Sequence, residues 1–288
     1  RSSDLDSAYL MKNLKNMNAA MKELDACIDE GGTMDFGKTG RKLGLHEFFL
    51  DWPTDGTKDA VTGTALLILY AARIFRETAK DSACGATICS IERKLSRYLC
   101  EETAKKQIAA FQVLCGKPSD GLKRLLEKDG ASGFSTFMSY FILKALIVSG
   151  SDRTVDYIKE YYGGMLSRGA TAFWEDFDIS WLDGSGRIDE IPAPDKKDLH
   201  ADYGQFCYKG LRHSLCHGWS SGVLPFFIEE IVGLKILEPG FKKVAVRPDL
   251  GSLKYIAAKI PTPYGVMSIE VKNGRTDVVV PNGITLVK

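Results

Sequence analysis

Three segments of this chain carry apolar side chains around nearly the whole circumference of a helix. In residues 57–80 these side chains are Val61, Ala65, Leu66, Ile68, Leu69, Ala72, Ile74 and Phe75. The same pattern recurs in residues 134–148 and 215–234. A helix that is apolar on all sides is a buried helix. The fold therefore has to cover these three segments with other structure.

Segments with one charged face lie before and between the three apolar ones. Residues 5–24 repeat apolar side chains at spacings of three and four, and residues 88–114, 120–128 and 153–166 each combine an apolar with a charged face. Buried and half-exposed helices thus alternate along the chain. This alternation predicts a double layer of helical hairpins, with an inner ring wrapped by an outer ring.

The pattern changes from helical to β-rich after Glu238-Pro239-Gly240. Asn273-Gly274 separates two β-rich runs, which predicts a hairpin. We therefore expect two domains, a helical one over residues 1–236 and a small antiparallel β domain over residues 237–288. The predicted strands are residues 243–247, 255–258, 266–271 and 276–280.

Charge and composition exclude several classes of protein. Thirty-eight Lys plus Arg against 37 Asp plus Glu leave a net charge of +1 without a basic stripe, so we expect no nucleic-acid partner. The longest nearly uncharged apolar stretch, residues 65–74, is shorter than the ~20 residues of a membrane span, so no span is predicted. Seven Cys without a Cys-x-x-Cys pair indicate buried free thiols, and we expect no metal and no cofactor.

The beginning of the chain predicts a processed protein or a piece of a longer one. It opens Arg-Ser-Ser-Asp, without an initiator Met or the apolar core of a signal peptide. The compartment stays open between a periplasmic or secreted and a cytoplasmic location.

Two motifs imitate known binding loops. Gly32–Thr39 matches the phosphate-binding pattern G-x-x-x-x-G-K-[ST], but an acidic helix precedes it and Gly40 follows, whereas phosphate binding needs a strand before and a helix after. Asp183–Asp189 resembles the middle of an EF-hand, but Trp181 and Pro192 would stand where the loop ends supply carboxylates. An ordinary Gly-rich loop and an acidic loop are therefore favoured over nucleotide and calcium sites.

Residues 169–222 contain most of the candidate functional side chains. Gly169–Asp178 places carboxylates beside aromatic side chains, which desolvate a carboxylate and can stack on a sugar ring. Two interpretations remain open from the residues alone: a carbohydrate active site, or a core containing Trp174 and Trp219 with a hydrogen-bonded core histidine. Three of the four histidines lie within eighteen residues, namely His200, His213 and His217.

The same stretch resembles a known family. Gly-Ala-Thr-Ala-Phe-Trp-Glu at 169–175 resembles the Gly-Ala-Thr-Thr-x-Trp-Glu segment of bacterial α-L-rhamnosidases, glycoside hydrolase family 78. Ser-Leu-Cys-His at 214–217 resembles the family's Ser-x-Asn-His, and residues 262–265 and 280–283 resemble its C-terminal β domain. The resemblance runs from about Gly44 onward. It implies a mainly α fold, an (α/α) six-hairpin toroid of which about half is present, followed by a small antiparallel β-sandwich.

The resemblance also implies the roles of the site residues. Glu175 would be the general base that activates water for inversion at the anomeric carbon, in a site whose two carboxyl groups lie ~6.5–9.5 Å apart. His217 would contact the sugar, and Trp174, Asp51 and Trp52 would line its pocket. No segment before Glu175 resembles the family's general-acid segment, so the acid and the remainder of the barrel are expected in a missing N-terminal half.

We therefore expect an inverting glycoside hydrolase that cleaves terminal α-L-rhamnose from a carbohydrate substrate, inactive as this chain alone. Cys216 in place of Asn and Ala172 in place of Thr leave the specificity open, and another α-linked deoxy sugar or uronide fits equally. The alternative is a non-catalytic sugar-binding or scaffold fragment that keeps Glu175 and His217 as contacts. A nucleotide-dependent enzyme using Gly32–Thr39 is the third alternative.

Overall fold

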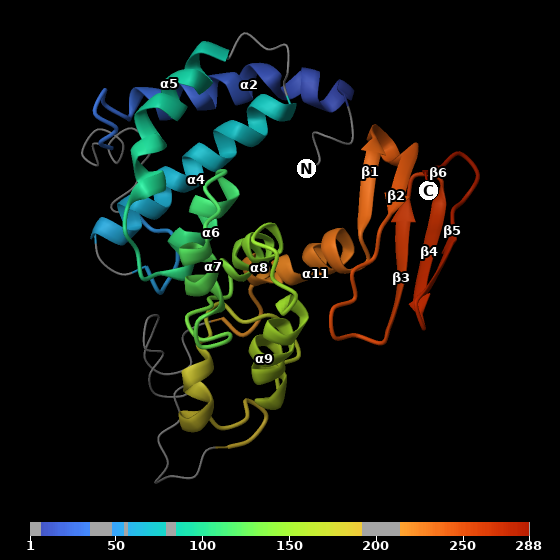
Figure 1. Cartoon of the computed structure of the whole chain (residues 1–288). Coiled ribbons are helices and arrows are strands. Elements are labelled where there is room, and N and C mark those ends of the chain that lie inside the picture. Colours follow the sequence, from blue (N-terminus) through green and yellow to red (C-terminus); the bar gives the residue numbers. More distant parts are fainter. Residues whose placement is uncertain (1–6, 35–47, 55–56, 79–84, 192–213, 288) are drawn as a thin grey trace.

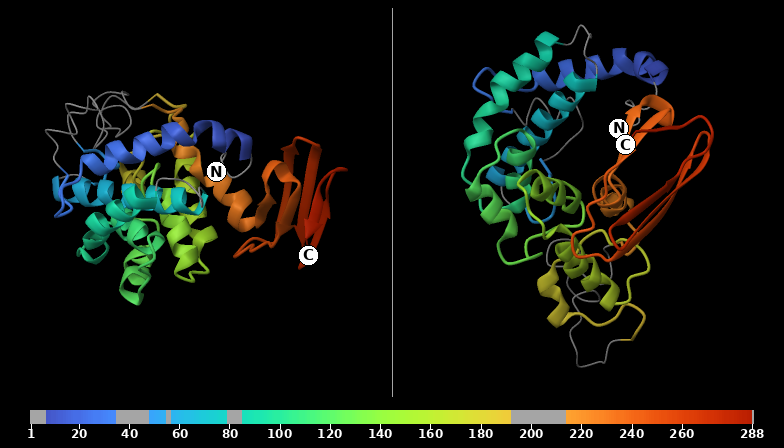
Figure 2. Two further views of the ribbon diagram at one scale, coloured as in Figure 1. Left: turned by 90° about the horizontal axis from the view of Figure 1, so that it is seen from above. Right: turned by 45° about the vertical axis from the view of Figure 1, so that its right-hand side comes forward.

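A computed structural model describes residues 7–34, 48–54, 57–78, 85–191 and 214–287 of the chain (Figure 1). Its helices follow an arc in chain order, and two small sheets lie beyond α11 (Figure 2). Among the residues described, no helix is both long and apolar enough to cross a membrane. The α-helices are α2 (Ser7–Ala26), α4 (Thr57–Thr78), α5 (Gly85–Leu95), α6 (Lys106–Leu114), α7 (Asp120–Glu127), α8 (Ser139–Val148), α9 (Thr154–Ser167) and α11 (Val223–Phe226).

Two of the predicted buried helices contribute the middle of the core. In α4 one face is fully buried, including Leu66 and Leu69, while Ile68 on another face is half-buried. In α8, Ile142 and Leu146 are fully buried, and α8 packs against α6. The prediction of buried helices is confirmed for their inner faces, but neither helix is enclosed on every side.

The segment 88–114 is not the single charged-faced helix that its pattern predicts. It divides into α5, the 3₁₀ helix η1 (Ser96–Cys100) and α6, and in α6 the residues from Lys106 to Val113 are buried. The polar side chains of α6 can be buried because each has a hydrogen-bond partner. Lys106 Nζ donates to the carbonyls of Lys128 and Gly130 at 2.7 and 2.6 Å, and Gln112 Nε2 donates to that of Glu101 at 2.7 Å.

The segment 215–234 is also shorter and less regular than predicted. It contains the 3₁₀ helix η3 (Gly218–Gly222), α11 and the π-helical turn η4 (Phe227–Ile231), and the chain then leaves the helix at Gly233 with φ +70°. A Cβ at Gly233 would come within 1.7 Å of the Arg247 carbonyl oxygen, so only glycine fits there. The last predicted helical residue, Leu234, instead begins strand β1.

Six strands form two three-stranded sheets, in the orders β1-β2-β6 and β3-β4-β5. The pairs β1–β2, β3–β4 and β4–β5 are antiparallel as expected, while β6 runs parallel to β2. The Asn273-Gly274 hairpin is confirmed, with φ +51° and +75° at the two turn residues between β4 and β5. The strands are β1 (Leu234–Glu238), β2 (Lys243–Val246), β3 (Tyr255–Thr262), β4 (Gly265–Lys272), β5 (Arg275–Val279) and β6 (Thr285–Val287).

One apolar cluster joins the two sheets into a small sandwich. Leu234 and Val244 contribute from the first sheet, and Met267 and Ile269 contribute from the second. Strand β1 begins before residue 237, where the sequence placed the domain boundary. The division into domains 1–236 and 237–288 stays a prediction.

Candidate active site

Glu175 lies where two distant segments of the chain meet. Its backbone N–H donates to the Ser214 carbonyl at 2.8 Å, and the Ser214 N–H donates back to Glu175 Oε2 at 2.8 Å. The His217 N–H donates to the Phe173 carbonyl at 2.7 Å. This pairing brings His217 Nδ1 to 4.0 Å from Glu175 Oε2. The structure thus places together the two residues that the resemblance singled out.

The two side chains differ in their access to solvent. The Glu175 side chain is 12% exposed, whereas that of His217 is 37% exposed. Oε1 of Glu175 accepts no hydrogen bond from the residues that the structure describes. The described residues therefore hold one oxygen of a largely buried carboxylate in place.

Asp51 is almost completely buried and contacts the segment 135–138. Its Oδ2 accepts hydrogen bonds from the Ser135 hydroxyl and from the Met138 N–H, the latter at 3.2 Å, and its Oδ1 accepts one from the Trp52 N–H at 2.9 Å. Burial raises the pKa of Asp51 to about 6, although these donors act in the opposite direction. Both carboxylate oxygens of Asp51 therefore accept hydrogen bonds from other residues of the protein.

The segment that Asp51 holds also holds Glu175. Between Ser135 and Met138, the Thr136 hydroxyl donates to the Glu175 carbonyl at 2.5 Å. Gln107 of α6 donates to the Ser135 hydroxyl oxygen at 3.0 Å, which links this arrangement to the buried helix. A chain of hydrogen bonds thus runs from Asp51 through the 135–138 segment to the Glu175 backbone.

The two tryptophans that the resemblance assigned to the sugar pocket differ in position. Trp174 is fully buried and its ring lies edge-on to Phe177, with 5.7 Å between the ring centroids. Trp52 is half-buried and lies 5.0 Å from the half-exposed ring of Phe49. Part of the Trp52 side chain is therefore exposed near the site, whereas Trp174 belongs to the core beneath the site.

Trp219 is a site residue that the sequence analysis left between core and pocket. It is half-buried, its Nε1 donates to the Glu175 carbonyl at 2.8 Å, and its ring centroid lies 5.1 Å from that of His217. It also stacks on Phe137 at 5.4 Å and faces Phe49 at 6.2 Å. The signal for its role was its place two residues after His217. We call Phe49, Trp52, Phe137 and Trp219 the aromatic cluster.

The other candidate ligands form no metal centre in the described part of the chain. His200 and His213 lie outside the described residues. Both carboxylate oxygens of Asp189 accept hydrogen bonds from the Arg187 guanidinium, at 2.9 and 2.7 Å, which lowers the pKa of Asp189. Among described residues, no group of three or more His, Cys, Asp or Glu could hold an ion.

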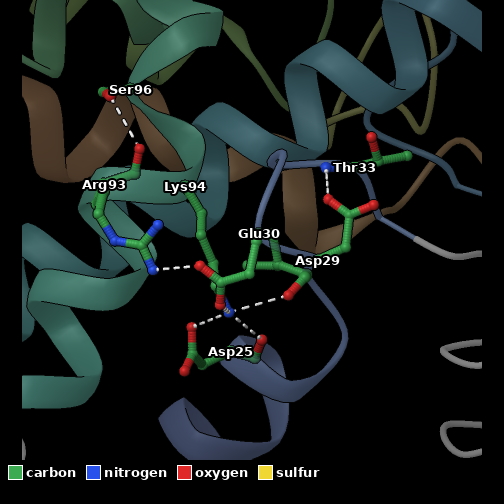
Figure 3. A network of polar contacts seen from close by, with 8 residues as sticks. Asp25, Asp29, Glu30, Thr33, Arg93, Lys94 and Ser96 are labelled. Carbon is green, nitrogen blue, oxygen red and sulfur yellow. Dashed lines mark hydrogen bonds and ion pairs between the residues drawn. The ribbon is translucent and has the colours of Figure 1, made fainter.

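The start of the phosphate-loop motif lies in a turn beyond the end of α2, between the bridged residues Ile28 and Met34 (Figure 3). It follows helix α2 and not a strand, and the buried Lys94 of α5 donates to the Asp25 carboxylate and to the Ile28 carbonyl, both at 3.0 Å. Gly32 has φ +80°, and a Cβ there would lie 2.1 Å from the Lys94 carbonyl oxygen. These contacts give this glycine a packing role. Residues 35–39 of the motif lie outside the described residues.

The arc of helices followed by a small β-sandwich defines the fold class, which is part of a helical toroid with a C-terminal β domain. The particular likeness is to bacterial α-L-rhamnosidases. Residues 233–286 match the model of the bacterial alpha-L-rhamnosidase C-terminal domain. A search of curated proteins finds no match.

Solved structures of rhamnosidases show the same fold. The GH78 family rhamnosidase of Bacillus sp. GL1 is 21% identical over 98% of this chain and 32% of its own length, with a TM-score of 0.66. The Streptomyces avermitilis α-L-rhamnosidase complexed with L-rhamnose is 14% identical over 98% of this chain and 27% of its own length, with a TM-score of 0.68. The Klebsiella oxytoca rhamnosidase with rhamnose bound is 18% identical over 77% of this chain and 42% of its own length, with a TM-score of 0.54.

These findings confirm the resemblance and the expected fold class. The chain has the fold of these rhamnosidases, and its residues 233–286 match the C-terminal domain of the bacterial family. It spans about a third of the length of the first two solved structures.

Proposed function

We propose that this chain carries the general-base side of the active site of an inverting α-L-rhamnosidase, with Glu175 as the base. The observation that carries the proposal is the state of the Glu175 carboxylate. Ser214 fixes Oε2, His217 stands 4.0 Å from that oxygen, and Oε1 has no partner among the described residues. A base needs this combination of a fixed orientation and one oxygen open to a water molecule.

The proposed reaction is a single displacement. Glu175 takes a proton from a water, whose oxygen attacks the anomeric carbon on the face opposite to the leaving group. The bond from the anomeric carbon to the leaving oxygen breaks, and an acid protonates that oxygen. The configuration inverts, and water is added across the glycosidic bond. We place the acid outside this chain, which covers 32% of its Bacillus relative.

The sugar would lie between His217 and the aromatic cluster. The partly exposed His217 ring can hydrogen-bond a sugar hydroxyl, and the rings of Trp52 and Trp219 offer apolar surface to the face of the sugar. Asp51 and Trp174 are covered, so we propose that they shape the pocket from behind rather than touch the sugar.

Binding by the chain itself tests the sugar site. Calorimetric titration with L-rhamnose should give saturable binding, and Glu175→Gln should retain it because the amide keeps the shape of the carboxylate. D-galactose serves as the sugar control. Absence of L-rhamnose binding would contradict the proposed site.

Turnover tests the base. In an active protein that contains this chain, Glu175→Gln should lower kcat by ~10²–10⁴-fold with KM little changed. Glu270→Gln, at an exposed position on β4, is the matched control and should change neither. Activity of Glu175→Gln within about threefold of wild type would rule out the base assignment. Rhamnose binding without turnover in any assembly would favour the alternative, a non-catalytic sugar-binding fragment.

A further inference from the structure

Hydrogen bonds join the segment 173–175 to the segment 214–220 at every residue of the first. Two of the five join backbone groups, one runs from the Ser214 N–H to the Glu175 carboxylate, one comes from the Ser220 hydroxyl, and one comes from the Trp219 indole. The pairs are Phe173 with His217, Trp174 with Ser220, Glu175 with Ser214 and Glu175 with Trp219. The position of the Glu175 carboxylate therefore depends on the register between two segments about 40 residues apart in the sequence.

The ring contact differs from the others because it touches both functional residues. Trp219 Nε1 donates to the Glu175 carbonyl at 2.8 Å, and the same indole lies 5.1 Å from the His217 ring in an edge-on arrangement. The Phe137 ring stacks on the indole with an interplanar angle of 25°, which restricts its rotation. One side chain thus connects the backbone of Glu175 to the imidazole of His217.

We infer that Trp219 is a positioning residue that fixes Glu175 and His217 relative to each other. Its N–H holds the Glu175 backbone and its ring supports the His217 ring, so the carboxylate and the imidazole keep one geometry toward a ligand. The inference rests on the proposed function where it takes Glu175 as the reacting carboxylate. A displacement of about 1 Å in such a group is enough to reduce turnover ~10²-fold.

Amide hydrogen exchange in the chain itself tests this role without requiring activity. Trp219→Phe keeps an aromatic ring and removes the N–H donor. Exchange at the Ser214 and His217 amides should then become about three- to tenfold faster, as the loss of one hydrogen bond predicts. The matched control is Trp181→Phe, because Trp181 is 2% exposed and its Nε1 has no hydrogen-bond partner among described residues. Unchanged exchange in Trp219→Phe, or equal acceleration in Trp181→Phe, would overturn the inference.

A second variant and a kinetic measurement complete the test. If Trp219→Phe does not fold, Phe137→Leu removes the ring that stacks on the Trp219 indole, and unchanged exchange at the Ser214 and His217 amides there would contradict the positioning role. In an active protein containing this chain, Trp219→Phe should lower kcat about tenfold or more with KM within about twofold. Because Trp219→Phe keeps an aromatic ring toward the sugar, a raised KM at unchanged kcat would mean that the indole N–H serves sugar binding, and it would overturn the positioning role. Faster exchange in a chain that binds no rhamnose would support the positioning role and contradict the proposed function.

Discussion

The buried carboxyl of Asp51 should make the stability of this protein depend on pH. Burial raises the pKa of Asp51 in the folded chain to about 6, from an ordinary value of 3.8. The folded state therefore binds more protons than the unfolded state between these two values. The stabilising contribution of the protonated Asp51 carboxyl is therefore fully present below its ordinary pKa of 3.8, is lost as the pH rises through ~6, and changes little above that. Two pKa units at 1.36 kcal/mol each give a loss of ~3 kcal/mol.

Asp51→Asn should remove this dependence. The amide has the same size, and its oxygen in the place of Oδ2 can still accept from the Ser135 hydroxyl and the Met138 N–H. Its NH₂ group in the place of Oδ1 leaves the Trp52 N–H without this acceptor, at a cost that does not change with pH. Urea unfolding of both proteins from pH 4 to pH 7 measures the effect. The free energy of unfolding of Asp51→Asn minus that of wild type should rise by ~2–2.5 kcal/mol over this range, because part of the full change falls below pH 4.

The control for the loss of one carboxylate is Asp277→Asn, at an exposed position on β5. Parallel stability curves for wild type and Asp51→Asn between pH 4 and pH 7 would refute the reasoning. They would mean that the donors around Asp51 compensate its burial fully.

Three further predictions concern other parts of the chain. His217→Ala should weaken L-rhamnose binding by ~0.5–1.5 kcal/mol in calorimetry, whereas unchanged affinity with a much lower Tm would make His217 a core residue. Lys94→Met should lower the free energy of unfolding in urea by ~1–3 kcal/mol, because it leaves the oxygens of Asp25 and Ile28 without the Lys94 donor. An unchanged free energy of unfolding would contradict a stabilising role of this contact. The chain alone should self-associate in sedimentation, because an apolar groove of about 510 Å³ lies between α9 and α11, with Leu166 and Leu224 exposed; a monodisperse monomer would contradict this.

Periodicity predicted the parts of the fold that follow simple rules. The spacing of Leu66, Leu69 and Phe75 located α4, because one face of a helix repeats every three to four residues. Asn273-Gly274 located a hairpin, because both turn residues need positive φ. The motif resemblance brought Glu175 and His217 together, which periodicity could not do across about 40 residues.

Other features depend on contacts that the local sequence does not contain. Lys106 and Gln112 resemble a solvent face, but they are buried because carbonyls of other segments accept their hydrogen bonds. Leu234 is the last residue of the predicted helix 215–234, but it begins strand β1 because β2 offers it a partner. The role of Trp219 depends on the carbonyl of Glu175, which only the folded chain brings to its indole.

The anomer released by turnover tests the central claim most directly. In an active protein that contains this chain, proton NMR during hydrolysis of an aryl α-L-rhamnoside should first show β-L-rhamnose, the inverted product. Glu175→Gly should release almost none, and azide should restore turnover with the rhamnosyl azide of β configuration as product. First appearance of α-L-rhamnose, or normal turnover without the Glu175 carboxylate, would contradict the assignment of Glu175 as the general base.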